Sequence, residues 1–266
     1  MKIGVVGNGY VGSAVRAFWE SRAEVLAWDT DPARCTHSQE EVANADLVFL
    51  CVPTPHVPGA GADHTAVFGA AEWLDRLRGH DNGWLLVKST VAPGTCRDLQ
   101  DVCSRFLVVS SPEFLTQRTA REDYADPSSV VLGFGPDGPN AELVHVHRQA
   151  FPGAIIQTVP WEAAELIKLA RNSFYAVKVG FFNDLADVCA AYHVPFDDVR
   201  DGVLASGWVN PMHTLVPGPD GQRGFGGACL PKDSLALVHA AGRYGAPMAA
   251  LRAAIEANRG RRPEVP

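Results

Sequence analysis

A glycine-rich segment near the start of the chain constrains the fold more than any other feature. Residues 7–12, GNGYVG, fit the pattern G-x-G-x-x-G and directly follow the apolar run KIGVV. In this pattern the first glycine permits a tight turn, the second lets the backbone approach a pyrophosphate, and the third lets a helix pack closely on a strand. The backbone N–H groups at the start of that helix would face the phosphates. The segment therefore predicts a strand, a phosphate-binding turn and a helix.

An acidic residue ends the second predicted strand, EVLAWD at residues 24–29. Asp29 lies about 20 residues beyond the glycines, where a carboxylate binds the hydroxyls of the adenosine ribose. Because a carboxylate repels a 2′-phosphate, we predict NAD rather than NADP as the cofactor. The predicted binding residues in this region are Gly7, Gly9, Tyr10, Val11, Gly12 and Asp29.

Short apolar runs alternate with helix-like segments over the first half of the chain. The runs cover residues 2–7, 24–29, 46–52, 84–89, 106–111 and 129–134. Continuous apolar runs are typical of strands buried on both faces, in a parallel sheet that helices cover. We therefore expect an α/β fold, with a Rossmann-like doubly wound parallel sheet as the NAD-binding domain over residues 1–158.

One long helical stretch follows, from residue 160 to about 193. Pro160 suits a first helical turn and Pro195 ends the stretch. We expect further helices at 196–205, 231–244 and 247–259, a Gly/Pro-rich loop at 206–227 and an unstructured tail. Residues 159–266 would thus form the long central helix and a small all-α domain for dimerisation and substrate binding. At about 1.5 Å per residue this helix would be about 50 Å long, which exceeds the diameter of a small domain. We therefore predict a homodimer that packs through this helix.

Composition and charge exclude several classes of protein. The formal net charge of −7 disfavours nucleic acid or an anionic membrane as the main partner. No apolar run approaches the roughly 20 residues of a membrane span, and the first residues lack the features of a signal peptide. We therefore expect a cytoplasmic protein. The six cysteines form no C-x-x-C pair, so thiols are expected and a metal site is not.

A cysteine near the carboxyl end stands where its thiol could be activated. In GFGGACLPKD, residues 224–233, Cys229 lies between a glycine loop and a predicted helix start at Pro231. The N–H groups and dipole at a helix N-terminus lower the pKa of a thiol, and Lys232 adds positive charge. Cys229 is therefore a candidate nucleophile. A buried structural thiol beside a glycine turn is the alternative.

Other candidate residues lie on the long helix and in two loops. Lys168 and Asn172 are four residues apart on one helix face and could hold an oxyanion, although such a pair also suits a solvated face. The segments KSTVAPGT (88–95) and SSPEFL (110–115) each follow a strand and would line the ligand crevice of a doubly wound sheet. They would bring Thr90 and Glu113 toward the cofactor.

Taken in order, these segments resemble the UDP-glucose/GDP-mannose dehydrogenase family. The likeness covers nearly the whole chain, to about residue 259, and GFGGACLPKD is its most specific part. The other matching segments are GNGYVG, Asp29, VPTP (52–55), KSTVAPGT, SPEFL and AELIKLARNSFYAVKVGFFND (164–184).

The resemblance implies a four-electron oxidation of a sugar C6 alcohol to a carboxylate, with two NAD. Cys229 would attack the intermediate aldehyde, and loss of hydride would give a thioester that water hydrolyses. Lys168 and Asn172 would stabilise the oxyanion, and Asp233 with Thr90 would hold a water. Glu113 would assist hydrolysis, while Thr54 and Thr90 would lie near the nicotinamide. The implied substrate-binding residues are Glu113, Phe114, Leu115, Lys168, Asn172, Phe225, Gly226 and Lys232.

The chain also departs from the family pattern. Family members normally continue with a further domain that grips the nucleotide, so we expect a short form lacking the C-terminal nucleotide-binding domain, or a separate chain that supplies it. Gln117 replaces an acid, Ser129 replaces an arginine, and the stretch 206–211 replaces an R-I-G motif. We infer that the redox chemistry is kept and that the substrate has changed, to a nucleotide sugar held differently or a sugar nucleoside.

Two other functions are compatible with these residues. A two-electron β-hydroxyacid dehydrogenase shares the architecture and uses a helix lysine and asparagine but no cysteine. A non-catalytic NAD-binding subunit could pair with a full-length dehydrogenase. Because Cys229, Lys168, Asn172 and Asp233 are all present, the second of these is disfavoured.

Overall fold

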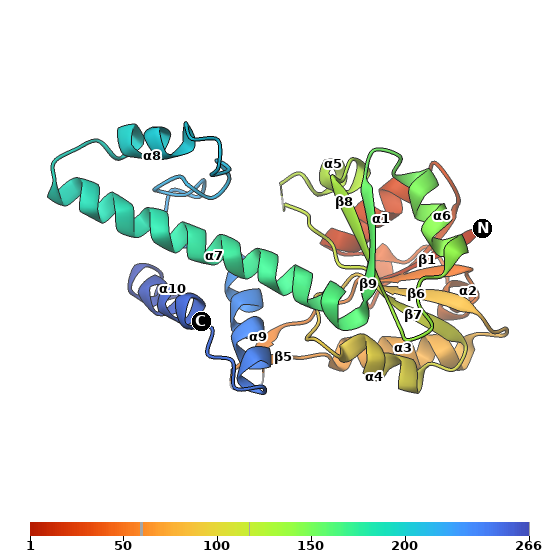
Figure 1. Cartoon of the computed structure of the whole chain (residues 1–266). Helices are drawn as coiled ribbons and strands as arrows, with labels where there is room; N and C mark the ends of the chain where they lie inside the picture. Colours follow the sequence, from red (N-terminus) through yellow and green to blue (C-terminus); the bar gives the residue numbers. More distant parts are fainter. Residues whose placement is uncertain (59–60, 117, 266) are drawn as a thin grey trace. The chain divides into compact units, whose positions relative to one another are not determined.

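The computed structural model describes residues 1–58, 61–116 and 118–265 and separates into two compact units. The first unit comprises Met1–Val57 and Ala62–Lys168, and the second comprises Pro58–Gly61 and Leu169–Pro266 (Figure 1). The boundary falls inside the long helix, between Lys168 and Leu169. The domain boundary at 158/159 expected from the sequence stays a prediction.

The first unit is built on a seven-stranded sheet with the order β2-β1-β3-β6-β7-β8-β9. All six strands expected from apolar runs are present, and β1, β2, β3, β6 and β7 run parallel. The chain moves from β1 to β2 on one side and then to β3 on the other, which makes the β1/β3 carboxyl edge a switch point for ligands. The strands are β1 Lys2–Val6, β2 Glu24–Trp28, β3 Leu47–Leu50, β4 His56–Val57, β5 Gly61–Ala62, β6 Gly83–Val87, β7 Phe106–Ser110, β8 Ser129–Phe134 and β9 Ile155–Pro160.

The far edge of the sheet differs from the all-parallel expectation. Strand β8 pairs antiparallel with β7, and β9 then pairs parallel with β8. The connection between β7 and β8, residues 111–128, contains the short helix α5 (Ala120–Ala125). Sequence patterning missed β9 because this strand is largely exposed, with Ile155 72% exposed, and shows no continuous apolar run.

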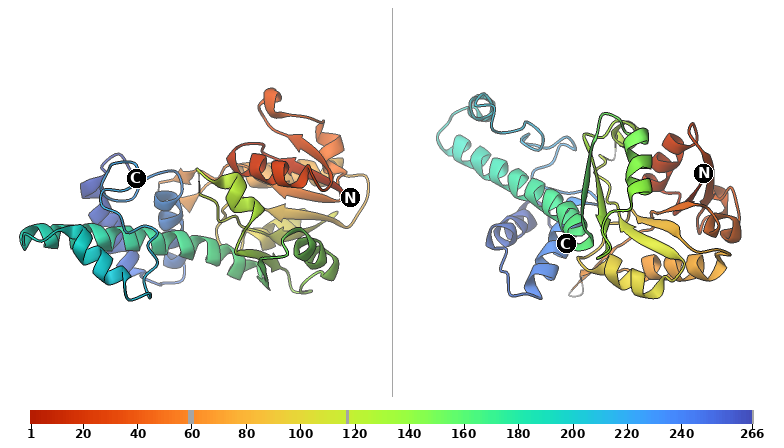
Figure 2. Two further views of the ribbon diagram at one scale, coloured as in Figure 1. Left: turned by 90° about the horizontal axis from the view of Figure 1, so that it is seen from above. Right: turned by 45° about the vertical axis from the view of Figure 1, so that its right-hand side comes forward.

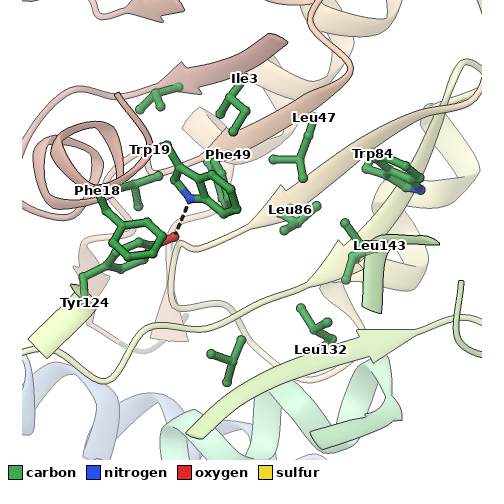
Figure 3. Close-up of a cluster of buried hydrophobic side chains, with 14 of the residues drawn as sticks. Ile3, Phe18, Trp19, Leu47, Phe49, Trp84, Leu86, Tyr124, Leu132 and Leu143 are labelled. Carbon is green, nitrogen blue, oxygen red and sulfur yellow. Dashed lines mark hydrogen bonds between the residues drawn. The ribbon is translucent and has the colours of Figure 1, made fainter. Parts of the chain in front are cut away.

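Helices cover both faces of the sheet in the first unit (Figure 1). Two separate buried clusters reflect this, one packed under α1, α5 and α6 and one under α2, α3 and α4. In the first cluster Trp19 Nε1 donates a hydrogen bond to the Tyr124 hydroxyl at 3.2 Å (Figure 3). The remaining elements are α1 Tyr10–Trp19, α2 Gln39–Ala43, α3 Thr65–Leu77, α4 Thr95–Val102, α6 Ala141–Ala150 and the 3-10 turn η1 Pro32–Arg34.

The second unit contains most of a long helix and three shorter ones (Figure 2). They are α7 Trp161–Ala191, α8 Phe196–Leu204, α9 Leu230–Gly242 and α10 Ala249–Arg261, which confirms the four helices expected from the sequence. Leu169 and Ala176 of α7 pack with residues of α9 and α10 in a third buried cluster. The tail expected to be unstructured is instead ordered where it begins, because Arg261 still belongs to α10 and Arg262 is buried. Within the described residues, none of the helices combines the length and apolar character that crossing a bilayer requires.

Candidate active site

Two glycines of the first turn are required by the packing of the protein itself. Gly7 has a φ of +85°, and a Cβ there would lie 2.7 Å from the Cys51 carbonyl oxygen. A Cβ on Gly12 would overlap the Gly7 carbonyl oxygen. The tight turn and the close approach of α1 to β1 therefore exclude any side chain at either position.

The middle glycine faces space that the protein leaves open. The nearest described atom to a Cβ on Gly9 is Arg34 Nη1, at 4.0 Å. Gly9 also stands at the N-terminus of α1, where it supplies no capping side chain. Beside it, Asn8 Oδ1 is buried and accepts no hydrogen bond from the described residues. An open helix N-terminus with an unused acceptor next to it fits the pyrophosphate and ribose of a dinucleotide.

The acid predicted to bind ribose is tied to this turn. Asp29 follows β2 and accepts hydrogen bonds from the backbone N–H of Asn8 at 2.7 Å and of Asp31 at 2.9 Å. These bonds orient the carboxylate while leaving further lone pairs for ribose hydroxyls. Of the other predicted residues, Tyr10 is exposed and Val11 is half-buried in the first turn of α1.

The loops after β3 and β6 are bonded to each other at the same edge of the sheet. The Thr54 hydroxyl donates to the Thr90 carbonyl oxygen at 2.8 Å, and the Ser89 hydroxyl donates to the Val52 carbonyl oxygen at 2.7 Å. Because both strands are parallel neighbours, their carboxyl ends bring Thr54 and Thr90 together, beside the glycine turn that follows β1.

A buried ion pair joins the loop after β7 to α7 within the first unit. Lys168 Nζ donates to Glu113 Oε1 at 2.8 Å, and Glu113 Oε2 accepts from the Leu115 N–H at 2.6 Å. Both charged side chains are more than nine-tenths buried. The Lys168 ammonium also lies 5.8 Å from the centroid of the Phe114 ring. Pairing compensates for burying the two charges and fixes the position of Lys168.

Lys88 is a second buried cation, which the sequence analysis did not single out. Its Nζ donates to the Ser111 hydroxyl at 3.0 Å, and burial lowers the pKa of Lys88 to about 8. Cys51, Glu113 and Lys168 lie near enough to influence this pKa electrostatically. Lys88 thus adds a second buried positive charge near the Glu113–Lys168 pair.

A buried carboxylate of α7 holds the start of α4 and was also missed. Glu165 accepts hydrogen bonds from the Gly94 N–H at 2.6 Å and the Cys96 N–H at 2.8 Å. Burial raises the pKa of Glu165 to about 7. Since the loop with Thr90 leads into α4, Glu165 ties that loop to the helix that carries Lys168. Lys88 and Glu165 lie inside segments that match the family, but those segments do not single out either residue, and only burial distinguishes them.

The second unit holds its own polar cluster. Asn172 Nδ2 donates to Asp233 Oδ2 at 2.5 Å, and Lys232 Nζ donates to Asp233 Oδ1 at 2.7 Å. Asp233 is 1% exposed, so both of its oxygens are held by donors inside the protein. The expected alternative of a solvated face is wrong for Asn172, which is buried.

Cys229 stands at the N-cap of α9, as predicted from the glycine loop and Pro231. It is exposed, so the alternative of a buried structural thiol is wrong. The Asp233 N–H donates to the Cys229 carbonyl oxygen at 2.9 Å, which places the cysteine one turn before the Asp233 cluster. The ring of Phe225, by contrast, is 3% exposed and packs in the core of the second unit.

The other predicted features concern the cysteines, a metal site and the departures from the family pattern. All six cysteines are thiols, and no group of three metal-ligating side chains occurs within residues 1–58, 61–116 and 118–265. Gln117 lies outside the described residues, Ser129 begins β8, and residues 206–211 precede a loop without helix or strand.

Sequence comparison matches two family models along the chain. Residues 33–151 match the NAD binding domain of the UDP-glucose/GDP-mannose dehydrogenase family, and residues 162–260 match the central domain of the same family. The chain is 34% identical to a UDP-glucose 6-dehydrogenase of Rickettsia conorii over 83% of its own length and 50% of the relative. It therefore spans about half the length of the curated relatives it matches.

Two solved structures resemble the chain to different degrees. A UDP-glucose dehydrogenase from the archaeon Pyrobaculum islandicum superposes with a TM-score of 0.85 at 27% identity, covering 97% of this chain and 68% of that one. The 3-hydroxyisobutyrate dehydrogenase of Mycobacterium tuberculosis superposes with a TM-score of 0.79 at 17% identity, covering 99% and 94% of the two chains. The second likeness shows a shared fold alone.

Proposed function

The chain belongs to the UDP-glucose/GDP-mannose dehydrogenase family, and from this premise we propose that it oxidises a sugar C6 alcohol to a carboxylate with NAD. The observation that carries the proposal is the exposed Cys229 at the start of α9, one turn before the buried Asp233–Asn172 pair. A thiol in this position suits attack on an aldehyde, whereas a two-electron dehydrogenase needs none.

The glycine turn, Asn8 and Asp29 would hold the cofactor, which when bound accepts a hydride in each of the two oxidations. The open space at Gly9 admits phosphate, and the bonds from Asn8 and Asp31 present the Asp29 carboxylate to the ribose. Thr54 and Thr90 line the same edge of the sheet.

The protein's own groups would then divide the work on the sugar. The Cys229 sulfur bonds to the aldehyde carbon while the carbonyl oxygen takes up negative charge, for which Lys168 and Asn172 supply N–H donors. Loss of hydride from that carbon leaves a thioester. Water then adds to the thioester carbon, the carbon–sulfur bond breaks, and the products are a carboxylate and the Cys229 thiol.

Two carboxylates are available to move the protons. Asp233 with Thr90 would hold water and take the proton of the alcohol, and Glu113 would assist the water in hydrolysis. The buried partners of Asp233 and Glu113 keep these carboxylates in fixed orientations. We propose a nucleotide sugar or a sugar nucleoside as the substrate class, since residues 206–211 and Ser129 depart from the family's sugar-binding pattern.

A turnover assay on a panel of nucleotide sugars and sugar nucleosides tests the proposal. The expected result is two NADH per uronic acid formed. Cys229→Ala should abolish the second oxidation, while Cys189→Ala, which changes a buried thiol of α7, should leave the ratio at two. Release of aldehyde alone by the unmodified protein, or full activity of Cys229→Ala, would contradict the thioester mechanism and favour a two-electron dehydrogenase.

We also propose a homodimer through α7. Phe174, Phe181 and Val188 recur every seven residues on this helix, and each is at least half exposed. A stripe with this spacing lies along one side of a helix and suits packing against a second helix. Light scattering should give twice the monomer mass, and Phe181→Glu should shift the protein to monomer. A wild-type protein that stays monomeric at high concentration would refute the dimer.

A further inference from the structure

The end of α10 is bonded to the loop that leads to Cys229. Asn258 lies in the last turn of this helix and is 4% exposed. Its Oδ1 accepts a hydrogen bond from the Phe225 N–H at 2.7 Å, and its Nδ2 donates to the Phe225 carbonyl oxygen at 2.9 Å. A single amide side chain thus satisfies both backbone groups of one buried loop residue, as a neighbouring strand would.

Arg262, one turn further on, bonds the same loop. Its Nε donates to the Arg223 carbonyl oxygen at 2.8 Å, and its Nη2 donates to Asp220 Oδ2 at 2.6 Å. The Arg262 side chain is 6% exposed, although it lies in a polar segment just after α10. Burying a guanidinium is unfavourable unless its hydrogen bonds are made, so these partners fix its position.

The side chains of Asn258 and Arg262 explain why residues 224 and 226 of the loop are glycines. Gly224 has a φ of +77°, and a Cβ there would overlap Asn258 Oδ1. A Cβ on Gly226 would lie 2.5 Å from Arg262 Nη1. The loop backbone therefore lies directly against the end of α10, which leaves no room for side chains.

We propose that Asn258 and Arg262 are positioning residues that hold residues 223–226 so that Cys229 stays at the N-terminus of α9. Gly224 and Gly226 carry no side chains and restrict the backbone little, so the loop depends on bonds from its neighbours. Asn183 Oδ1 accepts from the Gly224 N–H at 3.0 Å, Asn258 makes two bonds to Phe225, and Arg262 bonds the Arg223 carbonyl oxygen and Asp220 just before it. The consequence for sugar oxidation rests on the function proposed for Cys229, but the positional effect on the thiol does not.

The test measures alkylation of Cys229 by iodoacetamide on the full chain between about pH 6 and pH 9, with peptide mapping to count this cysteine alone. In Asn258→Ala and Arg262→Met, the pH of half-maximal alkylation should rise by about half a unit, because the thiolate loses part of its stabilisation by the helix N-terminus. Asn258→Asp keeps the acceptor for the Phe225 N–H and should fall between them and the wild type.

Arg259→Ala is the matched control, because Arg259 follows Asn258 on α10 and its guanidinium donates to Glu256 of the same helix rather than to the loop. Its alkylation profile should equal that of the wild type. Folded Asn258→Ala and Arg262→Met proteins with the wild-type profile would overturn the proposal, and if Asn258→Ala does not fold, Arg262→Met decides alone. No sugar is used, so a failure of the proposed oxidation is detected separately. Where turnover is found, both variants should lower kcat several-fold and leave the KM for NAD unchanged.

Discussion

Replacing Lys88 by methionine should stabilise the protein at neutral pH. The side chain is 5% exposed, its ammonium donates to the buried Ser111 hydroxyl, and burial lowers the pKa of Lys88 from 10.5 to about 8. No carboxylate forms an ion pair with it among the residues that the structure describes. Methionine has a similar length and no charge, so it removes the cost of burying the ammonium.

The sign and size follow from the difference between the two states. The folded chain releases the Lys88 proton at a lower pH than the unfolded chain, so the free energy of unfolding rises between about pH 8 and pH 10.5, and the full penalty applies below pH 8. A shift of this size corresponds to about 3 kcal/mol. Losing the bond to Ser111 offsets about 1–2 kcal/mol of this gain. Lys88→Met should therefore be more stable than the wild type by about 1–2 kcal/mol at pH 7, and no more stable at pH 10.

Urea unfolding followed by circular dichroism at the two pH values measures this difference. Burial raises the pKa of Cys51 to about 12, and because both proteins contain this thiol, its contribution largely cancels in the difference between them. Lys2→Met is the control, since the Lys2 side chain is 56% exposed and its removal should change little at either pH. A Lys88→Met protein that is destabilised equally at pH 7 and pH 10 would show that the buried charge is not what limits stability at this position.

Three further predictions concern single residues. Burial raises the folded pKa of Glu165 from 4.5 to about 7, so the wild type loses stability as the pH rises from about 5 to 8. Glu165→Gln lacks this titration and should gain up to about 3 kcal/mol relative to the wild type across that range. A difference between the urea midpoints of the two proteins that does not change with pH would contradict this. Gly12→Ala should lower the melting temperature and abolish NAD binding in calorimetry, because a Cβ there overlaps the backbone. Gly9→Ala should fold normally and bind NAD at least about ten-fold more weakly. Wild-type NAD affinity in both variants would rule out a cofactor at this turn. Gly224→Ala should lower the melting temperature more than Gly227→Ala. Both glycines have a positive φ, which costs a side chain about 1–2 kcal/mol, but a Cβ meets described atoms within 4 Å only at Gly224. Equal losses would mean that the end of α10 shifts to accommodate the added methyl group.

Much of the fold and of the candidate site could be predicted because the signals are local. The turn at Gly7 and Gly12 is set by backbone geometry over six residues, and the strands of the parallel sheet are continuous apolar runs. Cys229 was recognised from the glycines before it and the helix start after it, and its exposure agrees with that prediction. The reversed direction of β8 was not predictable from patterning, because an apolar run indicates a buried strand but not its direction relative to its neighbours.

The sequence by itself determined the dinucleotide turn, the six strands with apolar runs, the four helices after residue 160, the family, and a cysteine placed where a helix begins. These follow from residues that are close in sequence and that act through backbone conformation and apolar periodicity. Only the tertiary structure decided which polar side chains are buried and what they hold: Lys88, Glu165, Asn258 and Arg262 look like ordinary polar residues until distant segments pack around them. Burial turns each into a group that must be paired, and its partners are backbone or side-chain atoms that no local pattern identifies.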